Sequence, residues 1–294
     1  MKKAVVIGGA GFLGSHIVDE LSKRGYETII FDKKKSPWHK EHQKMVVGDF
    51  MDDALLENTI KGANYVYHFG GLADIGESRR KPVETVEVNV LGTMKILKAA
   101  AKETIDRLVY ASTMYVYSPY GSFYRASKQA SEILIETCQE EYGLDYTILR
   151  YGSLYGPRSQ SWNGLRSYVS QILQTGELYY RGTGREKREY IYVKDAARLS
   201  VDILDDIHNN QAITLTGQQI FSSKDLIDMI FEITGTKGQV IFSGEESLED
   251  HYGITPYRYT PKQSKKMVPD EFVDLGEGIL EMVEEIHGTI NQPL

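Results

Sequence analysis

The chain has 294 residues, which is long enough to bury one large core or to form two lobes. Hydrophobic residues make up 41% of it and charged residues 26%, the balance of an ordinary soluble globular protein. No apolar run approaches the roughly 20 residues that span a bilayer, and a net charge of −7 without a basic stripe argues against nucleic-acid binding. The first strand begins at the N-terminus and leaves no room for a signal peptide, and the single cysteine, Cys138, has no second cysteine to pair with. We therefore expect a cytoplasmic protein with neither a membrane nor a nucleic-acid partner, and we assign no metal site.

The first stretch of the chain predicts a dinucleotide-binding turn. An apolar run over 4–7 is typical of a buried strand, and it is followed by Gly8, Gly11 and Gly14 and by an amphipathic helix that begins near Phe12. Glycines allow the backbone to turn and to approach a ligand closely, and the free N–H groups at a helix N-terminus favour a pyrophosphate. A glycine-rich loop alone is weak evidence, but a strand before it and a helix after it are the context that dinucleotide binding requires.

A carboxylate at the end of the second expected strand indicates which dinucleotide binds. Asp32 follows the strand 27–31, about 20 residues after the glycine-rich turn. It can accept hydrogen bonds from both ribose hydroxyls and would repel a 2′-phosphate, which favours NAD over NADP. The lysines at 33–35 weaken this preference, because one of them can neutralise a phosphate.

Strands and helices alternate over the first half of the chain. Further strands are expected at 45–47, 65–69, 107–111 and 146–149, and helices from near Asp52, from about Pro82 to Lys102, and over 124–142. These strands are apolar throughout, which is typical of a parallel sheet with helices on both faces. The sequence therefore predicts an α/β fold with a Rossmann-type, doubly wound parallel sheet.

Beyond Arg150 the pattern changes. Glycines, prolines and aromatic residues become frequent and the elements shorten, which predicts a smaller, interleaved α/β substrate-binding lobe. A helix over 193–204 and a strand over 212–215 are expected to return to the sheet. We therefore assign 1–155 and 193–217 to the NAD-binding domain, and 156–192 and 218–294 to the substrate-binding lobe.

Two polar residues have alternative interpretations. Asp49 caps the helix that begins near Asp52, or it contacts the adenine ring of a cofactor. Asn89 lies within a helix, where it is either a buried amide that joins neighbouring elements or a surface residue. The pair Gly70-Gly71 follows the strand 65–69 and leaves room for a cofactor beside the backbone.

Tyr124 and Lys128 form the most informative pair of side chains. Residues at positions i and i+4 share one face of a helix, so the phenol and the ammonium can point into the same cleft. A nearby cation favours the phenolate and lowers its pKa, which makes a tyrosine usable as an acid or base near neutral pH. The spacing arises often by chance among 20 tyrosines, but Ser112-Thr113 ends the strand 107–111 at the edge where ligands bind.

Seven short motifs occur in a single order over essentially the whole chain. They cover residues 8–14, 67–71, 89–93, 110–113, 124–128, 149–158 and 188–195. Together they resemble the extended short-chain dehydrogenase/reductase family, and specifically its NAD-dependent nucleotide-sugar epimerase/dehydratase group. Each motif alone is unspecific, whereas the ordered set is highly specific.

The resemblance implies a role for each matching residue. Tyr124 is the catalytic base, Lys128 holds the nicotinamide ribose and tunes that tyrosine, and Thr113 hydrogen-bonds the reacting sugar hydroxyl. Ser153 and Arg188 contact the substrate, with Arg188 on its pyrophosphate unless an ion pair to a neighbouring glutamate occupies it. Arg258 is a second phosphate contact or a surface residue. The residues expected to line the cofactor are Gly8, Gly11, Phe12, Leu13, Gly14, Asp32, Asp49, Phe50, Phe69, Gly70, Gly71, Asn89, Ala111, Ser112, Lys128 and Tyr151.

Departures from the family pattern narrow the expected reaction. The dehydratases carry an Asp-Glu pair directly after the threonine, and the related decarboxylases carry a glutamate at the second of these positions. Here the two positions are Met114 and Tyr115. This argues against a dehydratase and weakens the hypothesis of a decarboxylase. Gly152-Ser153 replaces the usual Phe-Asn, which removes an amide that contacts substrate phosphates.

The expected function is NAD-dependent C4 epimerisation of a UDP-sugar. In the family a hydride leaves C4 for NAD, a 4-keto sugar forms, and the hydride returns to the other face, so tightly bound NAD need not be exchanged. The alternatives are a reductase, dehydrogenase or decarboxylase of a nucleotide sugar and, from another class, a non-catalytic NAD-binding regulatory module. The resemblance also implies a homodimer through a four-helix bundle of the helices around 83–101 and 127–142.

Overall fold

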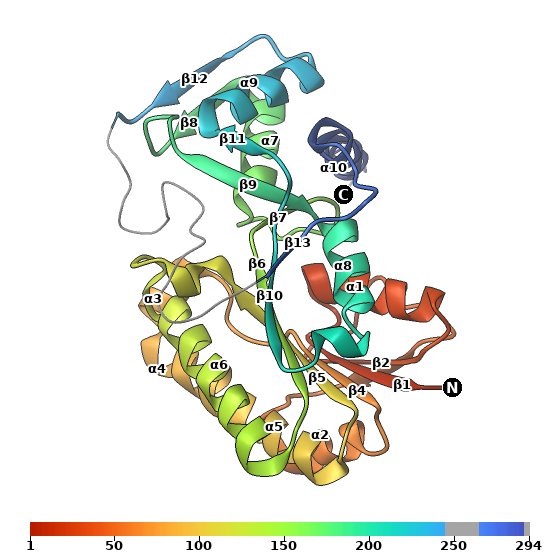
Figure 1. Cartoon of the computed structure of the whole chain (residues 1–294). Helices are drawn as coiled ribbons and strands as arrows, with labels where there is room; N and C mark the ends of the chain where they lie inside the picture. The colour runs from red at the N-terminus through yellow and green to blue at the C-terminus, as the bar shows by residue number, and fades with distance from the viewer. Residues whose placement is uncertain (245–264, 291–294) are drawn as a thin grey trace.

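The computed structural model describes residues 1–244 and 265–290. In this part of the chain, eight parallel strands form one sheet, in the order β13-β10-β6-β5-β4-β1-β2-β3 (Figure 1). The strands are β1 (Lys3–Ile7), β2 (Glu27–Asp32), β3 (Lys44–Val47), β4 (Tyr65–His68), β5 (Arg107–Thr113), β6 (Tyr146–Tyr151), β10 (Gln211–Leu215) and β13 (Lys265–Met267). Each strand expected from the apolar runs is present, with bounds that differ by at most two residues.

Helices cover both faces of this sheet (Figure 1). On one face α1 (Phe12–Lys23) packs against α8 (Val193–Asp202). On the other face α5 (Gly92–Glu103) packs against both α2 (Asp53–Ile60) and α6 (Ser122–Tyr142). The predicted Rossmann-type, doubly wound architecture is therefore confirmed.

Strand β1 explains why the sheet strands are apolar at every position. Ala4 and Val6 belong to the core cluster beneath α1 and α8, whereas Val5 and Ile7 belong to the cluster beneath α2 and α5. Successive side chains of a strand point to opposite faces, and here both faces are covered. A polar residue in the middle of β1 would therefore be buried on either side.

A second, smaller lobe holds two short sheets. One contains β7 (Ser153–Tyr155), β9 (Lys187–Tyr192) and β11 (Ile220–Ser222), and the other contains β8 (Glu177–Tyr180) and β12 (Gln239–Phe242). Three helices pack around them, namely α7 (Gly164–Thr175), α9 (Ser223–Thr234) and α10 (Leu275–Ile290). Strand β10 pairs with β6 and so returns to the large sheet, as does β13, although we expected the chain after 218 to stay in the smaller lobe.

The long helix expected from Pro82 to Lys102 is not uniform. It consists of α4 (Pro82–Val86), a π-helical segment over 87–91 and α5, and it is preceded by a short helix, α3 (Ile75–Arg80). Within the wide π turn the Asn89 carbonyl accepts hydrogen bonds from the Thr93 hydroxyl at 2.5 Å and from the Ser131 hydroxyl at 2.9 Å. A local departure from the α-helix therefore ties this helix to α6.

Two buried histidines make the fold sensitive to acid. His68, on β4, is 1% exposed, and burial and then the Lys128 cation lower its pKa to about 3. His16, on α1, is 6% exposed, and burial and then the Arg158 cation lower its pKa to about 4. Both values lie below the ordinary 6.5, so the unfolded chain binds more protons than the folded one below pH 6.5. Each histidine therefore contributes stability that is complete above pH 6.5 and is lost as the pH falls.

We expect the free energy of unfolding to fall by about 2–3 kcal/mol per histidine between pH 7 and pH 4. Urea denaturation at a series of pH values measures this loss. A His16→Gln variant, whose amide can still donate to the Pro157 carbonyl that His16 Nε2 contacts at 3.1 Å, should lose less stability over this range than the wild type. His42→Gln, at an exposed position, should follow the wild type, and equal slopes for all three proteins would contradict the assignment.

Candidate active site

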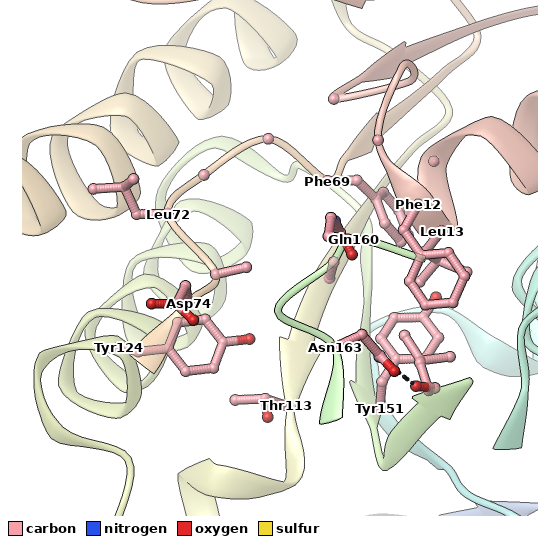
Figure 2. A pocket seen from close by; sticks show the side chains of 18 of the residues that line it. Phe12, Leu13, Phe69, Leu72, Asp74, Thr113, Tyr124, Tyr151, Gln160 and Asn163 are labelled. Atoms are coloured by element: carbon pink, nitrogen blue, oxygen red, sulfur yellow. Dashed lines mark hydrogen bonds between the residues drawn. The ribbon is translucent and has the colours of Figure 1, made fainter. Parts of the chain in front are cut away.

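A cleft of about 790 Å³ is lined by residues at the C-terminal ends of the strands of the large sheet and by residues of the smaller lobe, and Figure 2 shows part of this lining. Most of the residues that we expected to bind cofactor or substrate line it. They are Gly8, Gly11, Phe12, Leu13, Gly14, Asp32, Phe50, Phe69, Gly70, Gly71, Ala111, Ser112, Thr113, Tyr124, Lys128, Tyr151, Ser153 and Arg188.

The glycine-rich turn and the loop after β4 meet at van der Waals contact. Gly8 has φ +80°, and a Cβ atom added to it would lie 2.6 Å from the Gly70 nitrogen. A Cβ atom on Gly14 would lie 2.3 Å from the Gly8 carbonyl oxygen. Both positions therefore require glycine, and the α1 N-terminus lies open to the cleft. This arrangement fits the pyrophosphate of a dinucleotide.

Asp32 is held in place at the end of β2. Its Oδ2 atom accepts a hydrogen bond from the Ala10 N–H at 3.0 Å, and its Oδ1 atom accepts one from the Lys34 N–H at 3.1 Å. Lys33 and Lys34 both line the cleft, and Lys33 forms an ion pair with Asp49 at 3.0 Å. The fixed carboxylate suits the ribose hydroxyls of NAD. Once its charge is removed, a neighbouring lysine can neutralise the 2′-phosphate of NADP.

An Asp32→Asn substitution should lower the NAD/NADP affinity ratio by about tenfold or more, since it removes the charge but keeps the side-chain shape. Calorimetric titration of the cofactor-stripped protein with each dinucleotide measures the ratio. Asp49→Asn is the matched control, because Asp49 carries the same charge nearby but does not line the cleft. An unchanged ratio in the Asp32 variant would rule out this carboxylate as the selective group.

Three polar side chains converge on the middle of the cleft. Thr113 ends β5 and lies near Tyr124 of α6 (Figure 2), and Lys128 shares one face of α6 with Tyr124. Lys128 Nζ donates to the Ala111 carbonyl at 2.7 Å and lies 4.6 Å from the centroid of the Tyr110 ring and 5.9 Å from that of Tyr124. The helix and the strand end thus bring the phenol, the ammonium and the hydroxyl into one site.

Burial sets the electrostatics of this site. Lys128 is 7% exposed, and burial lowers the pKa of its ammonium to about 8, against the attraction of the nearby Glu132 carboxylate. At neutral pH the lysine is still a cation, and a cation in a low-dielectric site stabilises a negative charge on the adjacent phenol. The pair is therefore suited to accept and return a proton through the Tyr124 oxygen.

Asp49 and Asn89, which we expected to bind the cofactor, lie outside the cleft lining. Asp49 Oδ1 accepts a hydrogen bond from the Met51 N–H at 3.0 Å, and the N-cap of α2 is Asp52 instead. Asn89 is 2% exposed and connects Leu72 to Ser127, with its amide nitrogen donating to both at 3.0 Å. The amide is thus a buried link between the loop after β4 and α6. Arg258 lies outside the described residues.

No sequence pattern predicted the residues that line the far wall of the cleft. Two of these residues are caps: Asp74 Oδ1 accepts from the Glu77 N–H at the start of α3, and Asn163 Oδ1 accepts from the Arg166 N–H at the start of α7. Helix α3 has only 6 residues and gives little periodicity, so only its capping residue signals it. The further lining residues that we did not predict include Leu72, Ala73, Ile75, Glu84, Val88, Tyr115, Gln160, Trp162, Tyr168 and Tyr190.

Fold and site together define an extended short-chain dehydrogenase/reductase. The features behind this statement are the Rossmann-type sheet, the glycine turn and a cleft lined by Thr113, Tyr124 and Lys128. The sequence model of the NAD dependent epimerase/dehydratase family matches residues 4–215, so this chain belongs to that family. It is an NAD-dependent enzyme of the nucleotide-sugar epimerase group.

Individual relatives agree with this assignment. The chain is 28% identical to a putative UDP-glucose 4-epimerase of Methanocaldococcus jannaschii, over 95% of this chain and 96% of that protein. It is also 28% identical to a UDP-N-acetyl-alpha-D-glucosaminuronate decarboxylase of Bacillus cytotoxicus, over 85% of this chain and 86% of that protein. The structure of a Thermus thermophilus UDP-glucose 4-epimerase in complex with NAD superposes with a TM-score of 0.81 at 26% identity, covering 97% of this chain and 99% of that one. Within the described residues, no helix is both long and apolar enough to cross a membrane.

Proposed function

We propose that this enzyme inverts the configuration at C4 of a UDP-sugar. The observation that carries the proposal is that Thr113, Tyr124 and Lys128 line one cleft, while Met114 and Tyr115 follow the threonine and supply no carboxylate. A dehydration needs such an acid beside the sugar, whereas a C4 epimerisation needs only a base and a reversible hydride acceptor. The similarity to proteins named UDP-glucose 4-epimerase supports the same conclusion.

Each side chain has a defined part in this reaction. Tyr124, as the phenolate, removes the proton of the C4 hydroxyl and later returns it, and the Lys128 ammonium stabilises the phenolate before the first step and after the second. The Thr113 hydroxyl hydrogen-bonds the same sugar oxygen and orients it. The glycine turn and Asp32 would hold NAD, which would supply a reversible hydride acceptor for C4 of the sugar.

Arg188 is proposed to bind the diphosphate of the substrate. It lines the cleft from β9, while the next residue, Glu189, is buried and accepts a hydrogen bond from the Thr216 hydroxyl. Successive residues of a strand point to opposite faces, so the two side chains face different surroundings. A planar guanidinium suits a diphosphate because it can donate two parallel hydrogen bonds.

Replacing Arg188 by Ala should raise KM for the UDP-sugar about thirtyfold or more and change kcat little, since the lost interaction binds substrate and transition state alike. Steady-state kinetics measure both constants. Arg185→Ala, three residues before it and exposed, is the matched control and should leave KM unchanged. An unchanged KM in Arg188→Ala would indicate that this arginine is occupied by an ion pair with Glu186 or Glu189.

The direct test uses the protein as purified, without added cofactor. Mass and absorbance analysis identifies any bound dinucleotide, and incubation with UDP-, dTDP-, GDP- and CDP-sugars is followed by chromatography. Conversion of one UDP-sugar to its C4 isomer without net NAD(P)H change supports the proposal. Stoichiometric NAD(P)H consumption would identify a reductase, and release of CO₂ from a uronic acid would identify a decarboxylase. No turnover of any sugar would favour a regulatory NAD-binding role.

We further propose that the enzyme forms a homodimer through the outer face of α4, the π segment and α6. Apolar side chains on these adjoining elements are unusually exposed, with Val83 at 70% and Ile133 at 55%. Val86, Leu91 and Phe123 extend this surface. A second copy can bury both sets in a four-helix bundle. Light scattering should give twice the chain mass, and Ile133→Glu should give the monomer with the cleft intact.

A further inference from the structure

A buried chain of hydrogen bonds lies directly behind the catalytic residues. Glu132, on α6, is 0% exposed, and its Oε1 atom accepts a hydrogen bond from the Ser112 hydroxyl at 2.5 Å. Arg150, on β6, donates to both oxygens of this carboxylate, from Nε at 3.0 Å and from Nη2 at 2.7 Å. Its Nη1 atom donates to the Tyr117 hydroxyl, and its guanidinium lies 4.9 Å from the centroid of that ring.

Two members of this network adjoin a residue that lines the cleft. Ser112 precedes Thr113 on β5, and Arg150 precedes Tyr151 on β6. The register of the two strands places Ser112 beside Arg150. On α6, Glu132 follows Lys128 by four residues and Tyr124 by eight, so all three share one face of the helix. The network therefore joins the three elements that carry the reacting groups.

Stability alone does not account for this ion pair. Moving two charges out of water is costly, and apolar residues of similar volume usually stabilise a core as well or better. What the pair adds is direction, because a planar guanidinium that binds both carboxylate oxygens admits a single orientation. On the other side of α6, Ser127 and Ser131 form hydrogen bonds with Asn89 of the π segment. These bonds fix that side of the helix but not the side that carries Glu132.

We propose that Glu132 and Arg150 are positioning residues of the reaction. The pair fixes the rotation of α6 on the sheet so that Tyr124 and Lys128 face Thr113. The Glu132 carboxylate also supplies the negative charge that keeps the buried Lys128 side chain an ammonium ion. The catalytic part of this inference rests on the proposed function, whereas the charge on Lys128 can be measured without any substrate.

The surroundings of Lys128 support the electrostatic part. From β5 the Tyr110 ring faces it, from β4 the neutral His68 lies behind that ring with ring centroids 5.3 Å apart, and from its own helix come Tyr124 and Glu132. Burial drives the pKa of Lys128 down, and Glu132 is the carboxylate that opposes it. The positive charge of Arg150 lies beyond Glu132, so removal of the carboxylate would leave two buried cations near one another.

The first test replaces the pair by apolar residues of similar volume, Glu132→Leu with Arg150→Met. NMR of the NAD-loaded protein with ¹³C-labelled lysine side chains follows the titration of Lys128, whose signal is identified by its loss in Lys128→Met. We expect the Lys128 midpoint to fall by about one pH unit and kcat to fall at least tenfold, with a melting temperature near the wild-type value. A wild-type midpoint and kcat would overturn the proposal.

A second variant separates geometry from charge and decides the matter if the double variant does not fold. Arg150→Lys keeps the cation but loses the paired hydrogen bonds, so we expect kcat to fall several-fold with an unchanged Lys128 midpoint. Full activity would overturn the positioning role. Cys138→Ala, buried and on the same helix, is the packing control and should lower only the melting temperature. If the wild type turns over no nucleotide sugar, the proposed function fails while the midpoint comparison still tests the role of Glu132.

Discussion

Replacing Tyr124 by Phe should lower the rate of sugar conversion about a thousandfold and leave NAD and UDP-sugar bound. The substitution removes one oxygen, the atom that exchanges the proton of the C4 hydroxyl. The ring remains, together with its edge-to-face contact with Tyr115 at 6.4 Å between centroids, so the cleft keeps its shape. Chromatographic rates and calorimetric binding of the UDP-sugar, measured on the same preparation, separate the loss of chemistry from a loss of binding.

Tyr115→Phe is the matched control for this experiment. It removes a phenol hydroxyl from the same cleft, but its ring supplies the contact with Tyr124. We expect its rate to stay within about fivefold of the wild type. A rate for Tyr124→Phe within tenfold of the wild type would reject this tyrosine as the catalytic base. A large loss in Tyr115→Phe alone would transfer that role to Tyr115.

Gly14→Ala should abolish NAD binding and lower the melting temperature. The added methyl carbon would lie 2.3 Å from the Gly8 carbonyl oxygen and 3.0 Å from its carbon, and both are backbone atoms that cannot rotate away. Relief requires α1 to move off the glycine-rich turn, which carries the helix N-terminus away from the pyrophosphate. We expect the NAD affinity to fall at least a hundredfold, as measured by titration of the cofactor-stripped protein.

Two other glycines serve as comparisons for this prediction. At Gly11 the added carbon would lie 3.1 Å from the same Gly8 oxygen, so Gly11→Ala should give an intermediate loss of affinity. At Gly288, within α10, no atom lies within 4 Å, and Gly288→Ala should stabilise the helix slightly and leave NAD binding unchanged. Equal NAD affinities for Gly11→Ala and Gly14→Ala would show that a clash with backbone atoms is not the reason why these positions require glycine.

Much of the fold could be predicted because its signals are local and strong. Strand β1 is apolar at consecutive positions since both its faces are buried, and the glycines after it mark the turn without ambiguity. The return of the strand at 212–215 to the large sheet was predicted as well. In contrast, β13 has three residues and is placed by its pairing with β10, which no local pattern encodes.

The site divides in the same way. The positions of Thr113, Tyr124 and Lys128 in one cleft could be predicted because helix spacing and strand ends fix them, and that of Asp32 because it ends a strand, whereas their roles stay predictions. Asp49 could not be resolved, because a carboxylate near a helix start can serve the backbone, a lysine or a ligand. The Glu132–Arg150 pair was not predicted, since neither residue signals its partner 18 positions away until the sheet brings them together.

The way in which the chain passes between its two parts limits how the enzyme can move. After β6 the chain enters the smaller lobe at β7, returns at α8, leaves again at β11 and is back in the large sheet at β13 before α10 packs on the lobe once more. A movement of one part against the other must bend all of these connections together, which favours small sliding movements of packed elements. We therefore expect a dinucleotide along the floor of such a cleft to exchange more slowly than a sugar beneath the lobe. That difference in residence time suits a reaction in which the same hydride leaves and returns within one cycle.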